Sequence, residues 1–171
     1  QNPKKQKVIN RRDVRIGFAR PLESRSKTYV GKKGAYADVV SDVFQAAVLE
    51  GMTSTTQVIG VGDGGIGLKE ALEQQFPAML FILDKPHLKD HLYATAEALG
   101  IPQYDRAAWV TPRLEAICDG NVEQVRKALE ADYATAPHER VRQLIGYLTR
   151  FAEAVDYIHF TEQGYPIGSG E

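Results

Sequence analysis

The sequence has almost no cysteine and no long apolar run, and both absences narrow the class of protein. Its 171 residues include one cysteine, Cys118. A single thiol excludes an internal disulfide and favours a reducing compartment, so we expect a cytoplasmic protein. The longest apolar run, Ala78 to Leu83, is far shorter than the roughly 20 residues that a membrane-spanning helix needs. No charged-then-apolar leader precedes it, so neither secretion nor a membrane partner is expected.

Positive charge is scarce over most of the chain and concentrated at its start. Residues 1–33 carry eleven Lys or Arg against two acidic residues, whereas the remaining residues carry ten against twenty. A basic segment can bind nucleic acid by releasing counterions from phosphates, or it can be a solvated edge strand protected by lysines. On the first interpretation the DNA-binding residues are Lys4, Lys5, Lys7, Arg11 and Arg12.

Hydrophobic periodicity predicts strands and helices that alternate as far as about residue 100. Apolar residues alternate over 14–19, as in a half-buried strand, and 28–30 could form a short partner strand. The i, i+3, i+4 spacing over 36–48 predicts a helix that ends at Gly51.

Two further apolar strands each run into a carboxylate. Residues 56–62 lead to Asp63 and its glycines, and the continuous apolar run 78–83 leads to Asp84, with a helical pattern after each. Strand, helix, strand, helix in this order predicts a parallel α/β core. Because such sheets keep their chemistry at the carboxyl ends of the strands, we expect Asp63 and Asp84 to end neighbouring strands.

From residue 101 onward the apolar pattern is purely helical. Three amphipathic segments follow one another, and no alternating run interrupts them. We therefore expect a helical domain over about 101–157 that adds no strand to the sheet.

Two hypotheses compete for the stretch around Asp63. Gly60, Gly62 and Gly65 match the G-x-G-x-x-G phosphate cradle, and Asp84 stands where a ribose-binding acid belongs, which predicts a Rossmann-type NAD-dependent oxidoreductase. Against it, Asp63 would repel the pyrophosphate. Alternatively Asp63 is a metal-binding catalytic carboxylate, and the glycines beside it let a DNA backbone come close.

Asp84 also begins a pattern with two histidines. Asp84, His87 and His91 lie at i, i+3 and i+7, a spacing that metal ligands can use. Alternatively Asp84 caps the helix, with Pro86 in its first turn, and the histidines are polar surface or interface residues. Spacing alone favours the second interpretation.

Several motifs together resemble a known family. They are Tyr29-Val30-Gly31, Val61-Gly62-Asp63-Gly64, Gln75-Phe76-Pro77, Ile82-Leu83-Asp84 with His87 and His91-Leu92, Trp109, and the most specific one, Pro166-Ile167-Gly168-Ser169-Gly170-Glu171. Over nearly its whole length the chain resembles DDE-type insertion-sequence transposases, in particular the Kra-type group, with kinship to Mutator-like elements.

The resemblance implies a fold and its division. It predicts an α/β protein with a ribonuclease-H-like core and a helical insertion. Residues 1–100 would be the core without its first strand, 101–160 the insertion, and 161–171 the return to the core. Ser169 and Glu171 resemble the start of a further helix, so we expect a window cut from a longer protein.

The resemblance also implies the site residues. Asp63 would be the second catalytic carboxylate and Glu171 the third, and both would hold Mg²⁺ or Mn²⁺. Asp84 with His87 would be the D-x-x-H signature that follows the second carboxylate. The partners would be DNA and further copies of the protein in a transposition complex. The family's first catalytic Asp should lie on a strand before the basic segment, and no residue there qualifies, so we expect this stretch alone to be inactive. A relic that binds DNA without catalysis is the non-enzymatic alternative.

Overall fold

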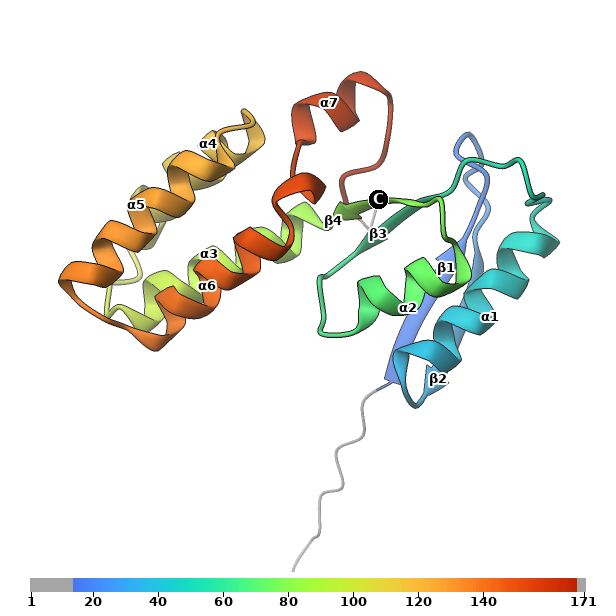
Figure 1. Ribbon diagram of the computed structural model, residues 1–171, viewed down its shortest axis with the longest axis horizontal. Coiled ribbons are helices and arrows are strands. Elements are labelled where there is room, and N and C mark those ends of the chain that lie inside the picture. The colour runs from blue at the N-terminus through green and yellow to red at the C-terminus, as the bar shows by residue number, and fades with distance from the viewer. Residues whose placement is uncertain (1–13, 169–171) are drawn as a thin grey trace, which may run out of the picture. The chain divides into compact units, whose positions relative to one another are not determined.

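The computed structural model describes residues 14–168 and shows a mixed α/β fold with two small sheets (Figure 1). The chain divides into two compact units. One contains the residues up to Thr56 together with Glu70–Pro77, and the other contains Gln57–Lys69 together with the chain from Ala78 onward. The boundary at residues 69 and 70 falls within helix α2 (Leu68–Gln75). The predicted division at residues 100 and 160 stays a prediction.

The first unit is built on an antiparallel hairpin. Strands β1 (Val14–Ala19) and β2 (Thr28–Lys33) pair along their full length, and helix α1 (Tyr36–Leu49) packs on them. Gly17 permits this close packing, because a Cβ there would lie 2.8 Å from the Val43 Cγ2 atom. The predicted strands and helix are therefore present.

Helix α1 ends as its sequence predicts. Gly51 adopts a φ of +94°, a left-handed conformation that suits glycine, and its N–H donates to the Val48 carbonyl at 3.0 Å. The N–H of Met52 donates to the Ala47 carbonyl at 2.9 Å. These two bonds satisfy carbonyls that the helix end would otherwise leave without donors.

Strand β1 has one largely exposed face and one packed face, as expected of a half-buried strand. On the exposed face, Val14 and Ile16 are 61% and 74% exposed. The opposite face carries Gly17 and packs on α1. Gly17 leaves room for α1 on this face. Apolar alternation predicts the strand but does not say which of its faces the helix covers.

The second unit contains a short parallel pair. Strands β3 (Ile59–Gly62) and β4 (Leu80–Leu83) pair in parallel from Ile59 opposite Leu80 to Gly62 opposite Leu83. Three consecutive β4 residues are buried, Phe81, Ile82 and Leu83, which confirms a strand covered on both faces. Within residues 14–168 the four strands form two separate pairs, so the single sheet of the expected ribonuclease-H-like core is not confirmed.

Helices make up the rest of the second unit. They are α3 (Lys85–Ala98), α4 (Arg106–Cys118), α5 (Val122–Thr135), α6 (Glu139–Arg150), the 3-10 turn η1 (Ala152–Ala154) and α7 (Tyr157–Glu162). All of residues 101–157 are described, and none of them forms a strand, as predicted. Each of α3 to α6 contacts the next, and α6 contacts α3, so four helices close into a bundle (Figure 1). The sequence did not predict that α3 belongs to it.

None of the helices in the described part of the chain is both long and apolar enough to cross a membrane.

Replacing Tyr157 by Phe tests how the helices hold the end of β4. The Tyr157 hydroxyl donates to the Leu83 carbonyl at 2.9 Å, and its loss leaves a buried acceptor without this donor. We expect the free energy of unfolding to fall by about 1–2 kcal/mol at neutral pH, measured by urea denaturation. Burial raises the pKa of Tyr157 above the ordinary 10.0. The wild-type advantage should therefore be complete below that pH and shrink above it, where the unfolded chain ionises first.

Tyr104→Phe is the control, because Tyr104 is 83% exposed and should lose no stability. Equal stabilities of wild type and the Tyr157→Phe variant at neutral pH would contradict the assigned hydrogen bond.

Candidate active site at the carboxyl ends of β3 and β4

The two carboxylates singled out from the sequence follow adjacent strand ends. The last residues of the parallel pair are Gly62 and Leu83, which lie opposite each other. The Asp84 N–H then donates to the Gly62 carbonyl at 2.8 Å, so the ladder continues to the point where both chains leave the sheet. The prediction that Asp63 and Asp84 end neighbouring parallel strands is confirmed.

Asp63 begins a tight loop and remains partly accessible. Its Oδ1 atom accepts the Gly65 N–H at 2.8 Å, which holds the carboxylate over its own loop. The Asp63 carbonyl accepts the Tyr147 hydroxyl at 3.0 Å, so helix α6 fixes the same residue from the other side. The carboxylate lines a pocket of about 510 Å³.

Asp84 is buried and paired with a histidine. The side chain is 2% exposed, and its Oδ2 atom lies 2.9 Å from His87 Nδ1. Asp84 occupies the cap position of α3, with Pro86 in the first turn, yet its carboxylate makes no capping bond to the helix backbone. The residues of the D-x-x-H signature therefore meet, and the capping interpretation holds for position but not for the carboxylate.

His91 is held by protein groups. Its ring stacks on Tyr147 with 4.2 Å between ring centroids, and His91 Nδ1 lies 3.4 Å from Arg140 Nη2. Burial lowers the pKa of His91, and the charges of Arg140 and His87 lower it further. A neutral imidazole can accept a hydrogen bond from the arginine.

The described residues do not by themselves form a metal site. Within residues 14–168, no group of three or more His, Cys, Asp or Glu side chains is arranged to hold a metal ion. Glu171, the second expected ligand, lies outside the described residues. The chain that leads to it does reach the site, because the Lys85 N–H donates to the Ile167 carbonyl at 2.9 Å. A Cβ on Gly168 would lie 3.9 Å from Asp84 Oδ1.

Helix α6 forms one wall of the pocket, which sequence reasoning missed. The pocket residues are Asp63, Gly64, Gly65, Ile66, His87, His91, Arg140, Gln143, Leu144, Gly146, Tyr147 and Arg150. Half of them belong to α6 and lie more than seventy positions from Asp63. Arg140, Gly146 and Arg150 share one face of this helix, and that pattern could have indicated a binding surface. It does not say which other part of the chain the face meets.

The glycines near Asp63 serve packing within the protein. A Cβ on Gly60 would lie 2.3 Å from Met79 Sδ, and one on Gly62 would lie 2.8 Å from Leu68 Cδ2. Both glycines belong to β3 and not to a loop after it. This arrangement disfavours the phosphate cradle of the dinucleotide hypothesis.

Gly64 makes room for helix α6 and for Phe151 after it, whereas the expectation that this glycine lets DNA come close stays a prediction. A Cβ there would meet Leu83, Phe151 and Tyr147 atoms at 2.9–3.0 Å, and its φ is +72°.

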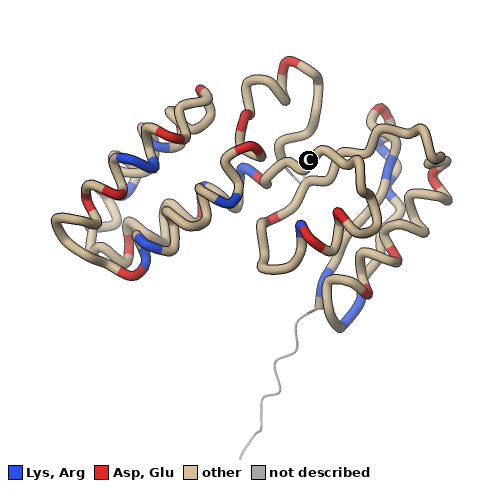
Figure 2. The backbone as a smooth tube through the Cα atoms, in the orientation of Figure 1, with Lys and Arg blue, Asp and Glu red and all other residues tan. Residues whose placement is uncertain are grey.

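The predicted DNA-binding residues Lys4, Lys5, Lys7, Arg11 and Arg12 lie outside the described residues. The basic segment continues into the β1–β2 hairpin of the first unit, where Figure 2 shows several basic positions.

No protein-family model matches the chain, and neither a curated protein nor a solved structure matches it.

Comparing Gly64→Ala with Gly120→Ala tests the packing of this loop. Both glycines have left-handed backbones, with φ of +72° and +79°, but a Cβ on Gly120 meets nothing within 4 Å. Gly120→Ala should cost about 1–2 kcal/mol for its backbone conformation alone. Gly64→Ala should cost about 1–3 kcal/mol more, because the helical segment must shift. Urea denaturation measures both. Equal losses would mean that the loop does not pack against α6 as described.

Proposed function

We propose that the chain is the catalytic core of a DDE-type transposase of the Kra-type insertion-sequence group, related to Mutator-like transposases. The intact protein would cleave DNA strands and join them to a target with Mg²⁺ or Mn²⁺. The observation that carries the proposal is the meeting of three motifs at one sheet edge. Asp63 and Asp84 follow paired strand ends, and Gly168 of the closing motif lies beside Asp84.

The order of elements supports a ribonuclease-H-like core as the finer fold. An antiparallel pair, a helix, a strand, a helix and a parallel strand follow one another in β1, β2, α1, β3, α2 and β4. This is the order expected of such a core after its first strand. On this proposal α4, α5, α6 and the start of α7 belong to the insertion between the second Asp and the Glu, and the chain returns to the core at residue 161.

The residues fit a divalent cation in the kind of ligand, although the described ones are too few. Asp63 presents a carboxylate to the pocket, and Glu171 would add a second. Hard oxygen donors suit Mg²⁺ better than nitrogen or sulfur. When bound, a pair of such ions activates the attacking water or DNA 3′-hydroxyl and stabilises the leaving oxygen. Asp84 would orient His87 at the edge of this site.

DNA and further copies of the chain would be the partners. The residues Lys4, Lys5, Lys7, Arg11 and Arg12 would add unspecific affinity through phosphate neutralisation.

The oxidoreductase alternative has less support. Side chains of Met79 and Leu68 occupy the space beside Gly60 and Gly62, so a phosphate has no room there. Asp84 is buried and paired with His87, so it is not free to bind a ribose. Micromolar binding of NADH, measured by its fluorescence, would reinstate this alternative.

Asp63→Asn tests the proposed function directly. The amide keeps the shape of the side chain but removes the charge that a cation needs. Loss of an outer-shell partner of a metal already costs about 10- to 100-fold, so loss of a direct ligand should lower plasmid nicking with Mn²⁺ by about 100-fold or more. The assay uses this chain and a version lengthened at both ends along its coding sequence, and we expect only the longer protein to nick.

Asp90→Asn is the matched control, because Asp90 is an exposed residue of α3 outside the pocket. The proposal fails if the longer protein nicks equally well with Asp63→Asn. It also fails if that protein binds DNA and never nicks, which would make the chain a non-catalytic DNA-binding relic.

A further inference from the structure

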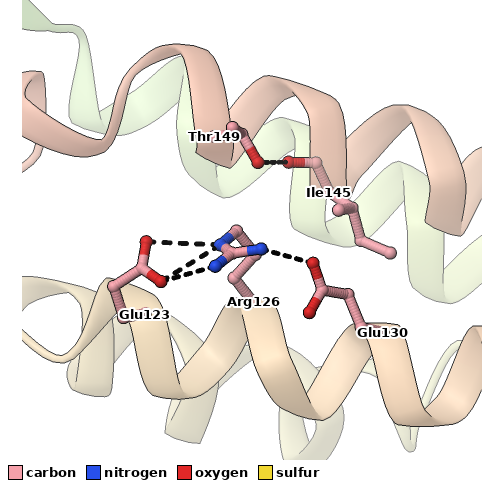
Figure 3. Close-up of polar contacts among 5 residues, drawn as sticks. All are labelled: Glu123, Arg126, Glu130, Ile145 and Thr149. Carbon is pink, nitrogen blue, oxygen red and sulfur yellow. Dashed lines mark hydrogen bonds and ion pairs between the residues drawn. The ribbon is translucent and has the colours of Figure 1, made fainter.

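The arginines of the helical bundle fall into two classes. Helices α4, α5 and α6 contain six arginines. Four of them have a carboxylate within ion-pair distance: Arg106 with Glu97, Arg113 with Asp132, Arg126 with Glu123 and Glu130, and Arg142 with Glu139. Figure 3 shows the guanidinium of Arg126 between its two glutamates. Charges neutralised in this way have little left to offer an anion.

Arg140 and Arg150 are the exceptions, and both line the pocket beside Asp63. Among the described residues neither has a carboxylate partner. Arg140 Nη1 lies 3.3 Å from Gln143 Oε1, and Arg140 Nη2 lies 3.4 Å from His91 Nδ1. Arg150 Nη2 lies 3.4 Å from the Gly64 carbonyl oxygen. All three contacts are long for hydrogen bonds, and Arg150 also lies over the Phe151 ring, 4.8 Å from its centroid. None of these contacts neutralises a guanidinium charge. Two available cations therefore face one pocket.

Gly146 lies between these arginines on α6 and also lines the pocket. Glycine is a poor residue for a helix interior, so its presence there calls for a reason. Packing does not require the glycine, because a Cβ on Gly146 would meet nothing within 4 Å. The backbone does not require it either, because Gly146 does not adopt a positive φ. The remaining physical use of such a glycine is the close approach of another molecule to the helix.

We propose that the α6 stripe, formed by Arg140, Gly146 and Arg150, binds the phosphate backbone of a DNA strand beside Asp63. The arginines supply the charge, and the glycine leaves room for the strand against the helix. Guanidinium groups bind phosphate through paired N–H donors and stay charged at any working pH. The choice of DNA rests on the proposed function, whereas the anion site rests on the arginines and the glycine.

The spacing of the arginines favours a strand over a single phosphate. They are ten positions apart on one helix, which corresponds to roughly 15 Å along its axis. One free phosphate ion cannot span that length, whereas successive phosphates of a strand can.

DNA binding without metal tests the stripe separately from catalysis. The chain is titrated into a fluorescein-labelled DNA duplex in EDTA, and anisotropy is followed over a range of salt concentrations. Arg140→Gln and Arg150→Gln should each weaken binding by about 3- to 10-fold and reduce the slope of log K against log salt by about 1. Arg142→Gln is the control from the same helix, because Arg142 is paired with Glu139, and it should bind like wild type.

A second comparison separates binding from folding. Gly146→Ala should raise Tm by about 2–4 °C through better helix propensity, yet weaken DNA binding. Thr149→Ala is its control on α6. The Thr149 hydroxyl bonds to the Ile145 carbonyl at 2.9 Å (Figure 3), and Thr149 does not line the pocket. This variant should keep full DNA affinity. A Gly146→Ala variant that is more stable and binds as well as wild type would overturn the role of the glycine.

The outcomes distinguish this inference from the proposed function. Arginine-dependent binding in EDTA, together with a lengthened protein that never nicks, would support the stripe and defeat the transposase proposal. Nicking that depends on Asp63, with binding unaffected by Arg140→Gln and Arg150→Gln, would overturn the stripe alone. Inorganic phosphate that binds at these arginines while the duplex does not would also overturn it.

Discussion

Two tyrosine hydroxyls hold the ends of two very short strands. Tyr147 donates to the Asp63 carbonyl at 3.0 Å, and Tyr157 donates to the Leu83 carbonyl at 2.9 Å. Strands β3 and β4 have four residues each, and an isolated two-stranded pair is at best marginally stable in water. Helices α6 and α7, which carry these tyrosines, therefore do more than connect Asp84 to the closing motif. It fixes the backbone at the point where Asp63 leaves the sheet.

Much of the local structure could be predicted, because the signals were local. The apolar run before Asp84 specifies a buried strand, and the spacing before Gly51 specifies a helix and its end. Parallel order then follows from a strand, a helix and a strand in succession, and it placed Asp63 and Asp84 side by side as observed. The contact between Asp84 and His87 also follows from short spacing along one helix.

The rest depends on contacts between distant parts of the chain, which periodicity does not encode. Nothing in the local pattern says that Gly64 must make room for Phe151, or that α6 must wall the pocket beside Asp63. Alternation predicted strand β1 but not which of its faces α1 would cover, since that choice rested on the space at Gly17. The glycines were the most misleading feature, because strand glycines that relieve crowding resemble a phosphate cradle in the sequence.

The site combines a carboxylate on a sheet edge with arginines on a helix from a later part of the chain. On the proposed function, a cation at Asp63 and phosphates at Arg140 and Arg150 would be complementary charges at a place for phosphodiester chemistry. The most direct test is the anomalous diffraction of Mn²⁺ in crystals of the protein grown with a DNA duplex. The account predicts a peak at the Asp63 carboxylate, with DNA phosphates between it and α6. Mn²⁺ bound only elsewhere, with no DNA along α6, would contradict it.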